Sequence, residues 1–201
     1  MDLLKYEKEA NLLGYNFVCG VDEAGRGPLA GPVFAAAVIL PKGLMIDGVN
    51  DSKKLSEKKR ESLFDVIKEK ALAFNIAFAS EKEIDEINIR EATFLAMQRA
   101  IEGLSIKADF ALIDGNALPK LSIDAKDIIK GDSLSLSIAS ASILAKVARD
   151  RYMIELAKQY PAYRFEKHKG YGTKLHRELI LENGPCEIHR KSFLKKILKD
   201  C

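Results

Sequence analysis

The chain has 201 residues, of which 47% are apolar and 30% are charged. This is ordinary globular composition, and a chain of this length buries about 70% of its unfolded surface, so it builds a core without disulfide or metal staples. It contains no long apolar run, and its N-terminus mixes acids with bases, which argues against a membrane span and a secretory signal. We therefore expect one domain over residues 1–201, in a monomeric cytoplasmic protein that does not contact a membrane.

The cysteines and the charges add two expectations. Cys19, Cys186 and Cys201 are odd in number and far apart, which indicates reduced thiols, with Cys19 buried in an apolar run. Residues 1–145 hold 18 Lys and Arg against 22 Asp and Glu, whereas residues 146–201 hold 14 against 7. All three histidines also lie in this basic last quarter. A polyanionic partner at that end and a solvated basic face explain the excess equally well.

The first half of the chain alternates between helical and extended patterns. Periodicity and capping residues predict a helix over 3–13, strands over 17–22 and 33–40, a helix over 56–71 that Ser56 caps, and a strand over 74–79. The segment 23–32 between the first two strands carries three glycines and two prolines. It is therefore predicted to be an irregular elbow that another molecule can approach closely.

The second half continues the alternation. The pattern predicts a helix over 80–104 that breaks near Asn88, strands over 110–114 and 127–130, a long helix over 133–159, a turn at 170–172, a helix over 173–182 and a basic C-terminal helix from Ser192. The many Ser and Ala residues early in the long helix are typical of a helix packed closely on a sheet. Strands that alternate with helices after an opening hairpin indicate an α/β fold with a mixed sheet.

Four acids lie at predicted strand ends next to a glycine or just before Ala24-Gly25: Asp22, Glu23, Asp114 and Asp132. Ligands of open α/β sheets gather beyond the strand ends, so these acids can converge there. Convergent carboxylates repel one another unless a cation neutralises them, and their hard oxygens suit Mg²⁺ or Mn²⁺. Each acid taken alone is also a common cap or turn former. Neighbours on a regular strand point to opposite faces, so Asp22 and Glu23 share a site only if the strand bends, as the nearby glycines allow.

Motifs spread over most of the chain occur in a specific order. They read DEAGRGPLAGPV at 22–33, NDSKKLS at 50–56, IDG at 113–115, KGDS at 130–133, ASILAKVARD at 141–150, HKGYGT at 168–173 and HRKSF at 189–193. This ordered set resembles the bacterial ribonuclease HII family, the type 2 ribonucleases H. The resemblance implies a ribonuclease H-like fold, with a mixed five-stranded sheet flanked by helices and a basic helical C-terminal portion from about 160 to 201.

The resemblance also implies an activity and a set of site residues. Members of the family hydrolyse the RNA strand of RNA–DNA hybrids and incise 5′ to single ribonucleotides embedded in duplex DNA, leaving 3′-hydroxyl and 5′-phosphate ends. Asp22, Glu23, Asp114 and Asp132 fall on the family's four acidic positions, which hold two divalent ions, Mg²⁺ or Mn²⁺. RNA–DNA hybrid and ribonucleotide-containing duplex DNA are the implied partners, and the sequence leaves a sliding-clamp partner open.

Substrate-reading positions follow from the same resemblance. Gly25, Arg26 and Gly27 fall on the motif whose backbone senses the 2′-hydroxyl, and Tyr171 on the tyrosine that packs against the next deoxyribose. Glycine suits the first role because only a residue without a side chain lets the backbone approach a ribose closely. Lys53 resembles a phosphate-contacting position, although a solvated lysine before a helix explains it equally well. Relatives often carry Ala or Pro where Gly172 follows Tyr171.

Three other functions remain as alternatives. A glycine loop for dinucleotides is disfavoured because Pro32 leads into a strand, whereas such a loop opens into a helix. A non-catalytic nucleic-acid-binding protein explains the basic end but not the four acids, which repel phosphate unless metals intervene. A resolvase-like two-metal nuclease of the same fold is the serious alternative. His168 and His176 lack helical metal-ligand spacing, so a surface or hydrogen-bonded role is expected for them.

Overall fold

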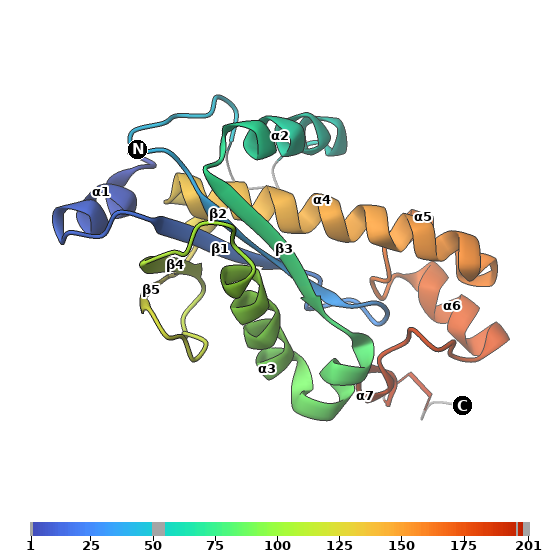
Figure 1. Cartoon of the computed structure of the whole chain (residues 1–201). Coiled ribbons are helices and arrows are strands. Elements are labelled where there is room, and N and C mark those ends of the chain that lie inside the picture. The colour runs from blue at the N-terminus through green and yellow to red at the C-terminus, as the bar shows by residue number, and fades with distance from the viewer. Residues whose placement is uncertain (1, 50–54, 196, 199–201) are drawn as a thin grey trace.

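A mixed five-stranded sheet forms the centre of the molecule. The computed structural model describes residues 2–49, 55–195 and 197–198. The strands are β1 (Val18–Ala24), β2 (Val33–Ile39), β3 (Ala73–Ala79), β4 (Phe110–Asp114) and β5 (Asp124–Ile128), in the order β3-β2-β1-β4-β5. β1, β2 and β3 pair antiparallel, while β4 and β5 run parallel to β1. The predicted mixed five-stranded α/β sheet is therefore confirmed (Figure 1).

Helices cover both faces of this sheet. They are α1 (Lys5–Leu12), α2 (Glu57–Lys70), α3 (Glu81–Glu102), α4 (Leu136–Gln159), α5 (Phe165–His168), α6 (Lys174–Asn183) and α7 (Lys191–Leu194), with short 3₁₀ helices at Gly131–Ser133 and Pro161–Tyr163. Helix α3 packs on one face, and α4 with α2 on the other (Figure 1). No helix in the described part of the chain is long and apolar enough to cross a membrane.

Two apolar cores lie on either side of β2, whose seven residues are all buried. Alternate side chains of a strand point to opposite faces, so Ala35 and Ala37 join the α3 core while Ala36 and Val38 join the α4 core. Helix α4 packs directly on β1, because a Cβ added to Gly20 would lie 2.1 Å from the Ser137 carbonyl carbon. Small residues at the start of α4 make this close approach sterically feasible, as the composition predicts.

Most predicted elements are present, with differences at their ends. β1 runs to Ala24 rather than Asp22. β5 spans Asp124–Ile128 rather than 127–130, and it ends there because Lys130 is left-handed (φ 59°) and Ile129 is 66% exposed. The long helix begins at Leu136, since Ser135 caps it by accepting from Ile138 N–H. The C-terminal helix α7 is only four residues long and starts at Lys191. The predicted break in α3 occurs at Asn88 (φ 65°), whose Oδ1 accepts two amides of the next turn.

The C-terminal portion packs at one end of α4. Helices α5, α6 and α7 lie together there, and α6 is carried well away from the central strands (Figure 1). A third apolar core joins them to Met153 and Leu156 of α4 and to Leu29 and Ala30 of the elbow. The elbow between β1 and β2 is therefore held between the sheet and the C-terminal portion.

Candidate active site

Acidic side chains meet at the carboxyl ends of two adjacent parallel strands. Val21 of β1 pairs with Ile113 of β4, so the residues that follow, Asp22 and Asp114, lie next to each other where β4 ends. A cavity of about 240 Å³ opens there. It is lined by Asp22, Glu23, Ala24, Gly25, Arg26, Gly27, Asp114, Ser142, Lys146 and Tyr171. The structure thus brings three of the four predicted acids, the elbow motif and the tyrosine together.

The bend expected between Asp22 and Glu23 is absent. β1 stays regular through Ala24, which pairs with Phe34 of β2. Both acids line the cavity all the same. The reason is that β4 ends at Asp114, so the last residues of β1 have no strand beside them on that edge. The open sheet edge beside β1, rather than a bend in the strand, therefore lets both Asp22 and Glu23 reach the cavity.

Negative charge is concentrated around Asp22. Its side chain is 4% exposed, and burial raises its pKa well above the ordinary value, with further increases from the charges of Glu23 and Asp114. Hydrogen bonds from Ser142 and from the Glu23 N–H, 2.7 Å from Asp22 Oδ1, act in the opposite direction. Arg26 Nη1 lies 3.7 Å from Glu23 Oε1. A bound divalent cation would relieve this repulsion.

Asp132, the fourth predicted acid, lies beside the cavity rather than on its lining. It is buried in the 3₁₀ helix after β5 and follows Gly131, whose N–H donates to Asp114 Oδ1 at 2.6 Å. The four acids offer the carboxylate oxygens that hard divalent ions prefer, so the donor set fits such an ion. Within the described residues, no three His, Cys, Asp or Glu side chains already form a group that could hold a metal.

Glycines in the elbow serve two different purposes. Gly25 has φ 97°, and a Cβ there would lie 2.0 Å from Nε of Arg149, so the fold itself requires glycine. A Cβ at Gly27 would meet nothing within 4 Å. Because Gly27 lines the cavity, its backbone is open to a molecule that enters there. This agrees with the close backbone approach that the sequence predicts for the elbow.

Two buried arginines hold the elbow by hydrogen bonds to its backbone carbonyls. Neither of them was assigned to the site from the sequence. Arg149 donates to the carbonyls of Pro32 (3.1 Å), Ala30 (3.2 Å) and Lys169 (3.0 Å). Arg190 donates to those of Gly31 (2.8 Å), Arg26 (2.9 Å) and Gly25 (2.6 Å). Both side chains are fully buried. Burial, and secondarily the charge of Arg149, lowers the pKa of Arg190 to about 9.

A sequence signal for part of this arrangement existed in α4. Ser142, Lys146 and Arg149 are spaced four and three residues apart, so they share one face of the helix. That face is the one that meets the cavity and the elbow. A charged side chain that continues a buried helical stripe predicts a specific partner, because an unpaired buried charge is costly.

Tyr171 forms one wall of the cavity, and its ring lies near two cations. Lys146 Nζ is 5.6 Å and Arg149 Cζ is 5.7 Å from the ring centroid, within the range of cation–π attraction. Tyr171 is 40% exposed and lines the cavity, so part of it is accessible to a molecule that enters there. Lys53, the predicted phosphate contact, lies outside the described residues.

Comparison with known proteins identifies the family. The family model described as Ribonuclease HII matches residues 19–196. The chain belongs to the ribonuclease HII family. It is 61% identical over 196 residues to the ribonuclease HII of Caldicellulosiruptor saccharolyticus, with 96% of both proteins covered. The identity to the ribonuclease HII of Caldicellulosiruptor bescii is 60% over 195 residues, covering 96% of this chain and 95% of that protein. The resemblance seen in the motifs is therefore confirmed.

Solved structures confirm the fold. The ribonuclease H2 of Pyrococcus horikoshii is 27% identical with a TM-score of 0.77, covering 92% of this chain and 98% of that one. A ribonuclease HII from Archaeoglobus fulgidus, solved in complex with PCNA, is 25% identical with a TM-score of 0.65, covering 83% and 88%. Bst-RNase HIII in complex with Mn²⁺ shares the fold at 19% identity and a TM-score of 0.72, covering 95% and 72%. The chain is thus a ribonuclease H enzyme that acts on RNA–DNA hybrids.

The histidines of this ribonuclease HII do not add to its basic surface. His168, His176 and His189 are buried, and their rings pack against one another. Burial lowers the pKa of His168 and lowers those of His176 and His189 to about 4, so all three are neutral at pH 7. The expected hydrogen-bonded role is confirmed, whereas a surface position is wrong.

Acidification is expected to destabilise the fold through these histidines. An unfolded histidine has a pKa near 6.5, so between about pH 6.5 and pH 4 the unfolded chain binds protons that native His176 and His189 do not. The free energy of unfolding, measured with urea, should fall as the pH is lowered through this window. A His189→Gln variant should show a shallower decline, and an equal slope in both proteins would contradict the assignment.

Proposed function

We propose that this ribonuclease HII also incises duplex DNA 5′ to a single embedded ribonucleotide, leaving 3′-hydroxyl and 5′-phosphate ends. The observation that carries the proposal is that one cavity combines acidic strand ends, open elbow backbone and an aromatic wall. The acids are suited to the cleavage chemistry, and the elbow and the ring to the recognition of a ribose followed by a deoxyribose. We treat residues 1–201 as one catalytic domain.

Asp22, Glu23, Asp114 and Asp132 are the residues that we propose to hold two divalent ions, Mg²⁺ or Mn²⁺. Bound there, the ions would supply an activated water and offset the charge on the leaving oxygen of an in-line displacement. The protein's own contribution is placement. The parallel pairing of β1 with β4 sets Asp22 and Asp114 side by side, and the Gly131 N–H donates to the Asp114 carboxylate at 2.6 Å.

The elbow and Tyr171 are proposed to select the ribonucleotide junction. The C=O and the following N–H of a trans peptide point in opposite directions. Because the carbonyls of Gly25 and Arg26 face Arg190, the N–H groups of Arg26 and Gly27 point away from it and are available to a 2′-hydroxyl. The Tyr171 ring then packs on the next sugar and favours deoxyribose. Arg26 is proposed to steady a phosphate.

Three substrates test the proposal and separate it from its alternatives. They are a duplex with one ribonucleotide, a long RNA–DNA hybrid and an all-DNA four-way junction, each incubated over a titration of Mg²⁺ and then of Mn²⁺. We expect metal-dependent cleavage of the first two and none of the junction. Junction cleavage would instead indicate a resolvase-like nuclease. Binding without metal and release of intact hybrid would indicate a nucleic-acid-binding protein. The ribonuclease HII of Archaeoglobus fulgidus was solved in complex with PCNA. Repeating the assay with a sliding clamp added tests whether such a clamp changes the cleavage rate of this protein.

Removing the Tyr171 ring is expected to impair junction cleavage selectively. In Tyr171→Ala, kcat/KM should fall about tenfold more on the single-ribonucleotide duplex than on the long hybrid, which corresponds to a lost transition-state contact of about 1.4 kcal/mol. Tyr152→Ala is the matched control, because Tyr152 is similarly exposed on α4 but packs on Phe34 and Phe78 instead of lining the cavity. Equal losses on both substrates would remove the junction-reading role.

A further inference from the structure

Three side chains of the C-terminal portion form a hydrogen-bonded chain that ends on the backbone of Tyr171. The Cys186 N–H donates to His189 Nδ1 at 3.0 Å, and the Cys186 thiol lies 3.1 Å from the same nitrogen. His189 Nε2 then lies 3.1 Å from His176 Nε2. His176 Nδ1 lies 2.9 Å from the Tyr171 carbonyl oxygen. We refer to Cys186, His189 and His176 as the histidine chain.

The partners at the two ends of the histidine chain fix the position of both ring protons. A carbonyl oxygen only accepts, so His176 carries its proton on Nδ1 and leaves Nε2 as an acceptor. At the other end, the Cys186 N–H only donates, so His189 Nδ1 accepts and its proton is on Nε2. The two deductions are independent, and both require His189 to donate to His176. One arrangement of neutral rings therefore satisfies the whole chain.

A proton cannot be added to the histidine chain without breaking it. If His176 were charged, its Nε2–H would face the Nε2–H of His189 across 3.1 Å. If His189 were charged, its Nδ1–H would face the Cys186 N–H across 3.0 Å. His176 is 0% and His189 is 2% exposed, and this burial favours the neutral rings that the hydrogen bonds require.

Tyr171 is held at both of its backbone polar groups. Its N–H donates to the His168 carbonyl at 2.9 Å, and its own carbonyl accepts from Thr173 N–H at 2.8 Å as well as from His176. His168 supports the same turn, because its Nδ1 accepts from Gly170 N–H at 3.2 Å and its ring stacks on His176 with centroids 4.2 Å apart. The ring of Tyr171 therefore extends into the cavity from a backbone whose direction His176 helps to set.

We propose that His176, oriented by His189, is a positioning residue that fixes Tyr171 for recognition of the ribonucleotide junction. This inference rests on the function proposed above for Tyr171. It assigns junction selectivity to a buried residue that does not itself line the cavity. The prediction is that a change in the histidine chain alters which substrate is preferred rather than only how stable the enzyme is.

Nitrogen-15 NMR of the histidine rings in the wild-type protein tests the chain without any substrate. At pH 7 we expect His176 to be protonated on Nδ1, and His189 and His168 on Nε2, since His168 Nε2 faces the Tyr163 carbonyl at 2.9 Å. His189→Gln, whose amide can donate in place of Nε2, should leave the His176 tautomer unchanged. A wild-type His176 protonated on Nε2 would overturn the proposal.

Substitution of His176 tests its effect on Tyr171. His176→Phe keeps a ring but removes the donor, whereas the amide nitrogen of His176→Asn occupies roughly the place of Nδ1. We expect the preference for the single-ribonucleotide duplex over the long hybrid to fall about tenfold in His176→Phe, which corresponds to the loss of about one hydrogen bond. In His176→Asn the preference should be largely restored. Ile180→Ala, which opens the same core one turn away on α6, should lower the melting temperature without changing the preference.

A fluorine label on tyrosine separates failure of this inference from failure of the proposed function. With 3-fluorotyrosine incorporated, the Tyr171 signal, assigned with Tyr171→Phe, should shift and broaden in His176→Phe but not in Ile180→Ala. If wild type does not prefer the embedded ribonucleotide, the proposed function fails, and the Tyr171 signal still decides the positioning role. An unchanged signal in a folded His176→Phe protein would overturn the inference.

Discussion

Asp114→Asn is expected to abolish cleavage of an RNA–DNA hybrid while hybrid binding stays within a few-fold of wild type. Asparagine keeps the shape of the side chain, and its Oδ1 still accepts from the Gly131 N–H. It removes one of the charges that the proposed site needs to hold divalent ions. A loss of about 4 kcal/mol of transition-state stabilisation corresponds to a rate reduction of about a thousandfold. Single-turnover cleavage and binding of a labelled hybrid measure the two effects separately.

Asp127→Asn is the matched control for this substitution. Asp127 lies on the neighbouring strand β5, pairs with Ile113 and is exposed to solvent. Its replacement makes the same change of charge at the next strand, away from the cavity, and should leave turnover unchanged. Mg²⁺ should raise the melting temperature of wild type and of Asp127→Asn. The increase for Asp114→Asn should be smaller. Near-normal turnover by Asp114→Asn would remove Asp114 from the proposed site.

Arg190→Lys is expected to cause the second large loss, in both stability and activity. A guanidinium spans the carbonyls of Gly25, Arg26 and Gly31, whereas an ammonium on a thinner stem cannot reach all three. Each buried carbonyl left without a partner costs about 1–3 kcal/mol. The free energy of unfolding should therefore fall by about 2–4 kcal/mol. Released from Arg190, the Arg26 and Gly27 amides lose their fixed direction, and kcat/KM on the embedded ribonucleotide should fall about a hundredfold.

Two further variants sharpen this test. Lys191→Ala changes the next residue along the chain, whose side chain is exposed, and should behave like wild type. Arg190→Ala opens a space the size of the lost guanidinium, so added guanidinium ion should restore part of the activity of this variant. It should restore no activity to Arg190→Lys, because the lysine side chain fills the space. Urea unfolding and kinetics report the two losses independently. Wild-type selectivity in a folded Arg190→Lys protein would show that the elbow holds its shape without this clamp.

Local patterns were enough to predict most secondary structure. The apolar run VFAAAVI forms β2 because it is buried on both faces, and the Ser80 capping box begins α3 as expected. The break at Asn88 was also predicted, since Asn tolerates a left-handed backbone and caps the turn that follows. The end of β5 was not predicted correctly. Ile129 looks like a strand residue, but pairing with β4 ends at Ile128, and pairing depends on the partner strand.

The acids of the candidate site could be found in the sequence, because each lies next to or within three residues of a glycine at a predicted strand end. Their convergence required the sheet. β4 is separated from β1 by more than eighty residues, and only parallel pairing places Asp114 beside Asp22. The arginines and histidines could not be found in this way. Many of their partners are backbone carbonyls and amides, which every residue carries, so only the helical stripe that includes Arg149 left a signal in the sequence.

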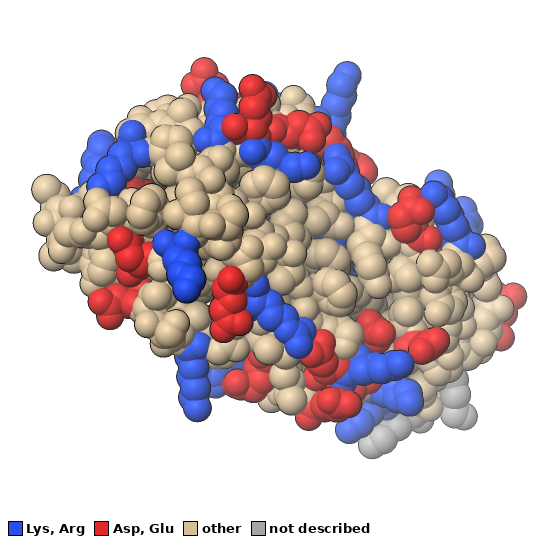
Figure 2. Space-filling model, viewed as in Figure 1, with Lys and Arg blue, Asp and Glu red and all other residues tan. Residues whose placement is uncertain are grey.

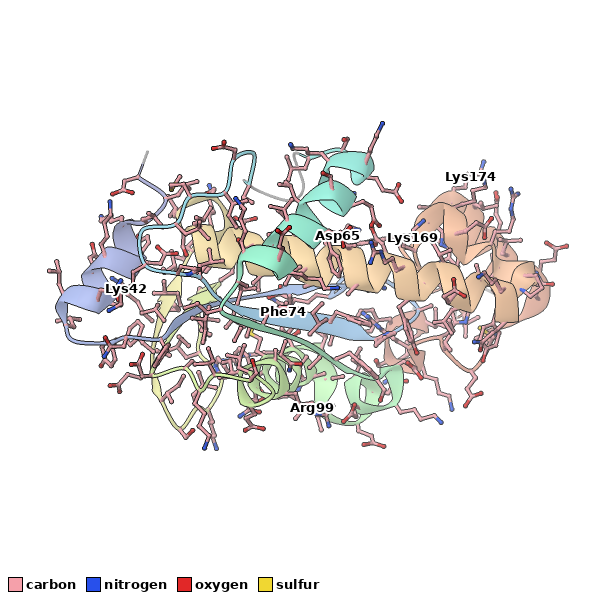
Figure 3. The ribbon with its side chains drawn as sticks, turned by 45° about the horizontal axis from the view of Figure 1, so that its top comes forward. Lys42, Asp65, Phe74, Arg99, Lys169 and Lys174 are labelled. Atoms are coloured by element: carbon pink, nitrogen blue, oxygen red, sulfur yellow. The ribbon has the colours of Figure 1, made fainter. Side chains whose placement is uncertain are left out.

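The distribution of charge was likewise determined partly by the sequence and partly by the tertiary structure. The sequence by itself determined that residues 146–201 carry an excess of base, and it determined the family through its ordered motifs. Only the tertiary structure decided which of those charges meet solvent. Lys174 points outward from α6 (Figure 3), whereas the Lys169 ammonium donates to the Glu166 carbonyl. Arg149 and Arg190 are turned inward to the elbow, and the three histidines are neutral.

The face shown in Figure 2 carries acidic and basic side chains interspersed rather than one basic patch. Several cations of the last quarter are paired, among them Lys146 with Asp150 at 2.8 Å. Sequence counts charges along the chain, but a charge acts according to its burial and its neighbours, and these follow from packing between distant segments. Part of the basic excess therefore serves to hold the elbow and Tyr171 in place at the acidic strand ends.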